Sequence, residues 1–183
     1  VYTTFPGGTE VPTFKRELCA EENAALDEAD KTLANSGPRD ASKSTKKNVR
    51  EDLVAAHGGT ISDKLVGPGA VHLLRVKVDL PPPPADRDVL RELVLQIKWD
   101  GETRASVWCP LGDFFGTAPC ANVYRSLPCG LTEDGWFYAN WFMPFAKSAR
   151  IEIENDNQRY QSNWQQMPCY SYVMYRTVKK LPK

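Results

Sequence analysis

The strongest constraint on the fold is an alternation of apolar and polar residues that begins near Gly58 and recurs along the rest of the chain. Between residues 70 and 80, charged side chains separate the apolar positions of one face, which are Leu74, Val76, Val78 and Leu80. A period of two is typical of a β-strand with one buried side. The run 93–99 repeats the pattern, and Asp100-Gly101 follows it as a predicted tight hairpin turn.

Eight segments of this kind can be recognised, with turn residues between them. They are 60–66, 70–80, 93–99, 104–110, 122–128, 135–145, 149–155 and 169–178. Helices do not alternate with these segments, which disfavours a parallel α/β fold. The prolines at 81–84 predict a surface connection because they cannot donate to a strand ladder. The pattern predicts an all-β fold, an antiparallel jelly-roll sandwich of about eight strands.

The first part of the chain, 1–57, is more polar and has helical spacing. Its apolar stripe is thin, and Gly37-Pro38 is expected to end the helix; the stripe consists of Phe14, Leu18, Ala25, Ala29 and Leu33. The stretch 40–48 has the composition of a solvated linker, and 49–57 predicts another short helical turn. We therefore expect an N-terminal arm, 1–57, that is partly helical or disordered, and a jelly-roll domain, 58–183.

Charge and cysteine usage exclude several classes of protein. The 23 Lys and Arg residues balance the 23 Asp and Glu residues, whereas nucleic-acid-binding proteins usually carry a basic excess. No apolar run approaches the roughly 20 residues that span a bilayer. The cysteines form no C-x-x-C pair, so no metal site is expected, and reduced packed thiols favour a soluble cytoplasmic protein; they are Cys19, Cys109, Cys120, Cys129 and Cys169.

Nucleophilic catalysis finds little support in the sequence. No G-x-S-x-G elbow is present, and nothing positions His57 or His72 beside a serine or a cysteine. Carboxylates remain, at the predicted strand ends, and a glycosidase needs two of them across the scissile bond. Each also has a plain structural role in a turn or in solvent; the candidates are Asp100, Glu102, Asp113, Glu133 and Asp134.

Aromatic residues are concentrated between 108 and 145. Beside carboxylates they could form a surface on which sugars stack, whereas aromatics at alternate strand positions usually belong to the core. In the segment 136–141, Trp136 and Tyr138 share one face, and Phe137 and Trp141 share the other. Both faces of this strand are therefore aromatic, and we expect cover on both sides.

Four stretches, taken in order, resemble a known family. They are 67–69 ("GPG"), 99–116 ("WDGETRASVWCPLGDFFG"), 143–155 ("MPFAKSARIEIEN") and 171–182 ("SYVMYRTVKKLP"). Together they resemble the first half of the difructose dianhydride I synthase/hydrolase family, glycoside hydrolase family 172, over about 58–183. The resemblance implies a subunit of two jelly rolls, assembled into trimers or larger rings such as hexamers. It implies retaining hydrolysis or transfer on α-D-fructofuranosides or α-D-arabinofuranosides, and no cofactor.

The resemblance also implies that this chain lacks the catalytic residues. The two catalytic glutamates of the family lie in the second jelly roll, in motifs like W-G-E-G-D and G-T-G-T-E-D-Y-F, and neither motif is present here. If the two jelly rolls are related halves, Gly112 takes the position of a catalytic glutamate, and Asp113 matches the aspartate that follows it. We therefore expect Asp113 to shape a loop.

Two main hypotheses follow. In the first, the chain is the non-catalytic first jelly roll, with a second jelly roll or a partner chain, a homo-oligomer and a carbohydrate as partners. The residues expected on one wall of the sugar pocket are Asp113, Phe114, Phe115 and Trp141. In the second, it is a stand-alone single jelly roll that binds carbohydrate or serves as a capsid-like structural protein. A third hypothesis makes the chain itself a glycosidase that uses Asp100 or Asp113 with Glu133.

Overall fold

A computed structural model describes residues 3–11, 16–38, 46–55, 60–156 and 166–177. The chain divides into two compact units, Val1–Asn35 and Ser36–Lys183. The first unit contains α1 (Ala20–Ala34), which confirms the helix expected there. At its start the Glu22 carboxylate accepts the backbone N–H of Cys19 at 2.8 Å, and Glu21 and Glu22 lie where the helix dipole favours acids. No residue of α1 is buried.

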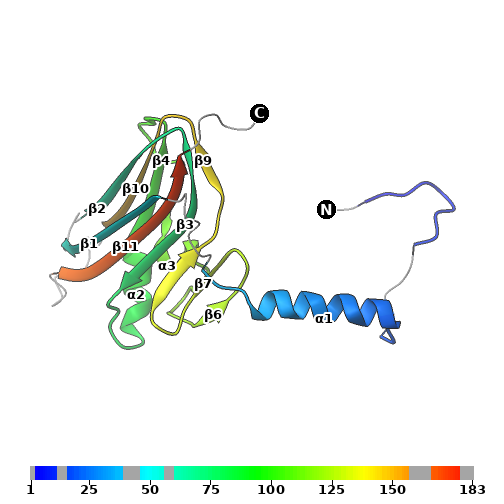
Figure 1. Cartoon of the computed structure of the whole chain (residues 1–183). Coiled ribbons are helices and arrows are strands. Elements are labelled where there is room, and N and C mark those ends of the chain that lie inside the picture. The colour runs from blue at the N-terminus through cyan, green and yellow to red at the C-terminus, as the bar shows by residue number, and fades with distance from the viewer. Residues whose placement is uncertain (1–2, 12–15, 39–45, 56–59, 157–165, 178–183) are drawn as a thin grey trace. The chain divides into compact units, whose positions relative to one another are not determined.

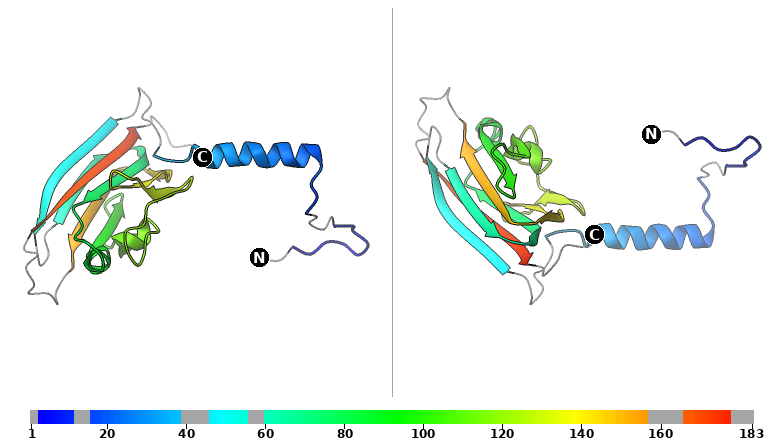
Figure 2. Two further views of the ribbon diagram at one scale, coloured as in Figure 1. Left: turned by 90° about the horizontal axis from the view of Figure 1, so that it is seen from below. Right: turned by 90° about the horizontal axis from the view of Figure 1, so that it is seen from above.

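The second unit is an antiparallel β-sandwich, as the alternation predicts (Figures 1 and 2). One sheet has the order β1-β11-β3-β8-β7-β6, with β9 also paired to β3, and the other has the order β2-β10-β4-β5. The strands are β1 (Lys46–Ala55), β2 (Thr60–Val66), β3 (Gly69–Val78), β4 (Leu93–Trp99), β5 (Val107–Pro110), β6 (Tyr124–Arg125), β7 (Cys129–Leu131), β8 (Trp136–Ala139), β9 (Met143–Phe145), β10 (Ser148–Asn155) and β11 (Gln166–Thr177).

The path of the chain moves between the two sheets. Strands β1, β3, β8 and β11 share one sheet, while β2, β4, β5 and β10 share the other. This interleaving is typical of a jelly roll, in which successive strands cross from one sheet to the other. Because most neighbours in a sheet are distant in sequence, the sandwich is held together by long-range pairing. For example, β11 pairs with both β1 and β3.

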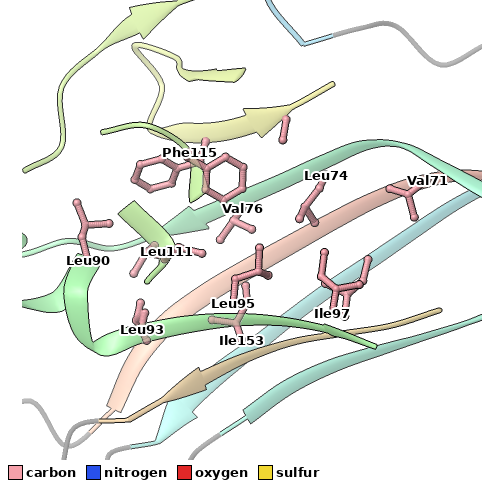
Figure 3. Packing of buried hydrophobic residues seen from close by; sticks show 14 of the residues in the cluster. Val71, Leu74, Val76, Leu90, Leu93, Leu95, Ile97, Leu111, Phe115 and Ile153 are labelled. Carbon is pink, nitrogen blue, oxygen red and sulfur yellow. The ribbon is translucent and has the colours of Figure 1, made fainter. Parts of the chain in front are cut away.

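The core lies between the sheets, and the alternation of the sequence places its residues there. Leu74 and Val76 of β3 face Leu95 and Ile97 of β4, and all four are fully buried (Figure 3). Ile153 of β10 joins the same cluster, as its register with Leu95 requires. The polar residues between these positions stay partly or fully exposed, as expected for a sheet with one buried face.

The turn predicted after β4 is confirmed in detail. Asp100 and Gly101 both have positive φ, 52° and 90°. The N–H of Glu102 donates to the carbonyl of Trp99 at 2.8 Å, which closes the turn. Positive φ at both central positions is the requirement of a type I′ turn, and Asp-Gly satisfies it at little cost.

The structure corrects the sequence-based prediction at β1. The helical turn predicted over 49–57 is wrong where the structure describes it, because residues 46–55 form β1, a strand that pairs antiparallel with β11. The part of the linker prediction that covers 46–48 is wrong for the same reason. The division of the chain therefore falls between Asn35 and Ser36, earlier than the predicted boundary at 57–58.

Two further differences concern the connections. The proline-rich stretch continues into α2 (Ala85–Glu92), an amphipathic helix that buries Val89 and Leu90 and that the sequence analysis did not predict. The long strand predicted over 135–145 is interrupted between β8 and β9, and the strand predicted over 122–128 is only the two residues of β6. The interruption leaves Trp141 and Phe142 exposed in a short connection.

Candidate functional site

The predicted wall of the sugar pocket begins at α3 (Leu111–Phe114), a single helical turn that follows β5. The turn is closed by backbone bonds from Phe115 N–H to Leu111 O at 3.3 Å and from Thr117 N–H to Gly112 O at 2.9 Å. Gly116 follows with φ 69°, and a Cβ there would lie 2.6 Å from the Tyr124 hydroxyl oxygen. That hydroxyl donates to the carbonyl of Phe115. Glycine is thus required at 116 by both backbone conformation and space.

The position that the resemblance aligns with a catalytic glutamate is tightly enclosed. Gly112 is buried, and a Cβ built on it would lie 3.1 Å from the Cβ of Leu90 in α2. Figure 3 shows Leu90 close to Leu111, at the contact between α2 and the segment that includes α3. Any side chain at 112 would therefore begin closer to Leu90 than ordinary van der Waals contact allows, and Leu90 would have to shift to admit a glutamate.

Asp113 is engaged with α2. Both oxygens of its carboxylate accept from Nη1 of Arg91, with an Nη1–Oδ1 distance of 2.5 Å. The two side chains are 52% and 35% exposed, so the ion pair lies at the surface. The pair links α3 to α2, so the Asp113 carboxylate is engaged within the loop region rather than free.

The three predicted aromatic residues lie together, from the core outward. Phe115 is fully buried and packs on Phe137 of β8 with a centroid distance of 5.5 Å. Phe114 meets Phe115 edge-on at 5.0 Å and stacks on Trp141 at 6.0 Å with an angle of 28° between the rings. Trp141 is 48% exposed. We call Phe114, Phe115 and Trp141 the aromatic wall. Of the three side chains, Phe115 belongs to the hydrophobic core, and Trp141 is the one that is exposed to solvent.

The other strand-end carboxylates hold turns. Asp100 accepts backbone N–H groups of Ala146, Lys147 and Ser148, the turn that leads into β10. These bonds, the one from Lys147 foremost, lower the pKa of Asp100. A general acid of a glycosidase needs a raised pKa, so Asp100 is prepared for a structural role.

Glu102 and Asp134 are used in the same way. Glu102 accepts the N–H of Trp99 at 3.2 Å and the hydroxyl of Ser106. Asp134 accepts the hydroxyl of Thr132, and this bond is the main cause that lowers the pKa of Asp134. Glu133 is exposed and forms no hydrogen bond or ion pair with any residue that the structure describes.

The sequence did not predict a groove that lies on the face of the β3–β8 sheet turned away from the core. Its volume is about 400 Å³, and it is lined by residues 37–38, Arg75, Arg125, Thr132, Glu133 and Asp134. The guanidinium of Arg75 lies over the Trp136 ring, 4.7 Å from its centroid. Glu133 and Asp134 were already candidates in the sequence, and Arg75 is a polar residue between the apolar positions of β3, but nothing in the sequence relates them to Arg125.

The remaining candidates do not form a site. His72 packs edge-on against Phe142 at 5.2 Å, and His57 lies outside the described residues. Cys109, Cys120 and Cys129 are half-buried free thiols, and Cys19 is exposed. Within the described ranges, no three His, Cys, Asp or Glu side chains are grouped so that they could hold a metal ion. The helices found there are also too short or too polar to cross a bilayer.

The solved structures that resemble this chain include distant ones from unrelated sources. A serine protease of Aeromonas sobria, solved with its chaperone, matches with a TM-score of 0.36 and 14% identity over 85% of this chain and 30% of the protease chain. A structure of tomato aspermy virus matches with a TM-score of 0.36 and 10% identity over 90% of this chain and 100% of that chain. The chain thus spans less than a third of the protease, and at these scores the likeness carries no argument about function.

Comparison with curated proteins gives no match. A family model does match, and its description is GH172 domain-like. The match covers residues 47–167, which is more than half of the chain. It begins in β1 and ends in β11, so it includes β3, β4, α3, β8 and β10 between them. The chain belongs to the GH172 domain-like family, and it is thereby related to glycoside hydrolases.

Proposed function

We propose that this chain is the non-catalytic N-terminal jelly-roll portion of a retaining glycoside hydrolase or transferase that acts on α-D-fructofuranosides or α-D-arabinofuranosides. In this role it gives the scaffold and an oligomer interface, and it contributes one side of the sugar pocket through the aromatic wall. The observation that carries the proposal is the combination of the family match with a loop at 111–117 in which no carboxylate is free to react.

The carboxylates predicted from the sequence offer no free pair among the described residues, which supports the non-catalytic part of the proposal. Retaining hydrolysis needs a nucleophilic carboxylate and a second carboxyl that acts first as acid and then as base. Asp113 is bound to Arg91, Asp100 to three backbone N–H groups, and Asp134 to Thr132. Only Glu133 among the predicted carboxylates is uncommitted within the described residues, and one carboxylate is not a pair.

The aromatic wall supports the sugar-contact part. Trp141 is held by stacking on Phe114, which is itself braced against the buried Phe115. A half-exposed indole fixed in this way presents a flat apolar surface at little cost in side-chain entropy, and the C–H faces of sugar rings pack on such surfaces.

Exposed apolar residues support an interface. Phe142 is 59% exposed and lies next to Trp141 in the connection between β8 and β9. Val123 and Leu127, on either side of β6, are also exposed. Exposed large apolar side chains of this kind are typical of a surface that another protein covers. The occupant that we propose is the second jelly roll or a partner subunit.

The test measures turnover and binding separately on the 183-residue chain. With p-nitrophenyl α-D-arabinofuranoside we expect no turnover. With methyl α-D-arabinofuranoside we expect binding by titration calorimetry that Trp141→Ala weakens and Trp108→Ala leaves unchanged. Trp108 is a matched control because it is also an exposed tryptophan, at 59%, on β5. Turnover that is lost in Asp113→Asn would instead make this chain an enzyme and refute the non-catalytic role.

A further inference from the structure

The groove and the aromatic wall are on opposite sides of one strand. In β8, Phe137 and Ala139 belong to the core cluster, and Phe137 packs on Phe115 beside the wall. Trp136 alternates with them and meets Arg75, which lines the groove. Successive side chains of a strand point to opposite faces, so the two sites are separated by the thickness of the sheet.

The base of the groove is held rigidly. Arg75 of β3 lies opposite Tyr138 of β8 in the sheet register, and Tyr138 is fully buried. The Tyr138 hydroxyl accepts the N–H of Ser126 at 3.1 Å and donates to the carbonyl of Ser126 at 2.9 Å. These bonds fix the chain beside Arg125, the other arginine of the groove, while the Trp136 ring supports the guanidinium of Arg75.

The rim is a hydrogen-bonded turn. Thr132 N–H donates to the carbonyl of Trp136 at 2.9 Å, and Gly135 N–H donates to the carbonyl of Thr132 at 2.9 Å. The Thr132 hydroxyl donates to Asp134, and Arg75 and Lys77 contribute further to the low pKa of that carboxyl. Asp134 is therefore ionised at neutral pH and is oriented before any ligand arrives.

Two charged groups of the groove are uncommitted. Arg125 and Glu133 are exposed, and neither makes a hydrogen bond or an ion pair with any residue in the described part of the chain. Arg125 offers several N–H donors in a plane, and Glu133 offers two acceptor oxygens. The four charged side chains that line the groove, Arg75, Arg125, Glu133 and Asp134, cancel in formal charge.

This balance selects the class of ligand. An anion would meet two carboxylates, and a cation would meet two guanidinium groups, so neither gains from the groove as a whole. A hydroxyl group both donates and accepts, and neighbouring hydroxyls can bind an arginine and a carboxylate together. The volume of about 400 Å³ lies within the range of small-molecule sites.

We propose that this groove is a second binding site, for a neutral sugar unit with neighbouring hydroxyl groups, on the sheet face opposite the aromatic wall. Arg125 and Glu133 bind the hydroxyls, and Arg75, which is held over the Trp136 ring, forms the fixed side of the site. The carbohydrate class rests on the function proposed above. The site itself rests on the groove and its charged groups. It would hold a second part of a longer glycan, or a separate sugar, without taking part in the reaction.

The experiment maps binding on the whole 183-residue chain by two-dimensional amide NMR. The probes are methyl α-D-arabinofuranoside and methyl α-D-fructofuranoside, with glucuronate and inorganic phosphate as anionic probes. We expect the neutral sugars to shift the amides of residues 132–136 and the Trp136 indole N–H. Arg125→Gln and Glu133→Gln should each weaken that binding about tenfold, the effect of one charge-assisted hydrogen bond. Arg87→Gln is the matched control, an exposed arginine on α2 that does not line the groove.

Each alternative outcome has a separate meaning. Shifts at Trp141 and Phe114 that persist in both groove variants, with none at 132–136, would refute the groove and leave the proposed function intact. Sugar shifts at the groove with none at the wall would refute the sugar-contact role of the wall and support the groove. Tighter binding of phosphate or glucuronate than of the neutral sugars would overturn the ligand class. No sugar-induced shift at either place would overturn both proposals.

Discussion

The two faces of β8 show two ways to build a surface. On one face, Phe137 packs on Phe115, and the wall is an outward extension of the hydrophobic core. On the other face, Trp136 supports Arg75, and the groove is made of ions and hydrogen-bonded turns. The wall therefore owes its shape to burial, whereas the groove owes its shape to backbone hydrogen bonds that lie beneath its charged side chains.

The difference teaches where binding can change without loss of the fold. A residue of the wall that also belongs to the core cannot be altered for binding alone, because its burial stabilises the sandwich. The exposed charges of the groove contribute little to stability, so they can be exchanged at small cost. Three measurements test this contrast.

The largest expected change in the free energy of unfolding follows a substitution in the aromatic wall. Phe115→Ala should lower the free energy of unfolding by about 3–5 kcal/mol, the usual cost of truncating a buried phenylalanine. Phe142→Ala is the matched control because Phe142 is 59% exposed, and it should cost less than about 1 kcal/mol. Both values come from urea denaturation. Similar costs for the two variants would show that the wall is not anchored in the core.

The second effect concerns the loop that carries the wall. Gly112→Ala should destabilise the chain by about 1–3 kcal/mol, because the new methyl carbon would lie 3.1 Å from the Cβ of Leu90, closer than ordinary van der Waals contact. Gly7→Ala serves as the control, since a Cβ at Gly7 has no atom within 4 Å. If Gly112→Ala proves as stable as the parent chain, α2 can move away, and the argument for a closed catalytic position fails.

The smallest effect is at the rim of the groove and depends on pH. The pKa of Asp134 is lowered in the folded chain, so its stabilising contribution is complete above the ordinary value of 3.8 and is lost as the pH falls through the folded value. Asp134→Asn should therefore lose less stability than the parent between pH 5 and pH 2.5. The carboxyl is largely exposed, and solvent screening keeps the difference below about 1 kcal/mol.

Denaturation midpoints measured across this pH range check the prediction, with Asp30→Asn on α1 as the control. An identical pH profile for Asp134→Asn and the parent chain would mean that Thr132 and the neighbouring cations do not hold the carboxylate. The rim would then owe its form to the backbone turn alone.

The core strands were predictable because their signal is local. Leu74, Val76 and Val78 can be recognised from their spacing, and the Asp100-Gly101 turn from two adjacent residues. By contrast, β1 was mistaken for a linker and a helical turn, because its residues are mostly polar and its strand form is fixed by pairing with β11, more than a hundred residues later. Only the folded chain brings these two segments together.

For the candidate site, too, the local features could be predicted from the sequence and the long-range ones could not. Asp113, Phe114 and Phe115 are adjacent in sequence, and their nearness to Trp141 could be expected from a crowded aromatic region. The ion-pair partner of Asp113 could not be predicted. Arg91 belongs to α2, and the four prolines before α2 indicated a surface connection rather than a helix. The groove was missed for a related reason. Arg75 and Arg125 lie on different strands, and neither has a motif around it.

The carboxamide of Asn140 joins distant parts of the chain at the groove. Its Nδ2 group donates to the carbonyl of Gly37 at 2.8 Å and to that of Leu127 at 3.0 Å, and the first bond joins residues 103 apart in the chain. Closing a loop of this length costs conformational entropy, which the packing of the sandwich must offset. Residues 37–38 line the groove, so this bond fixes one part of the lining to the connection between β8 and β9, and the groove is complete only in the folded chain.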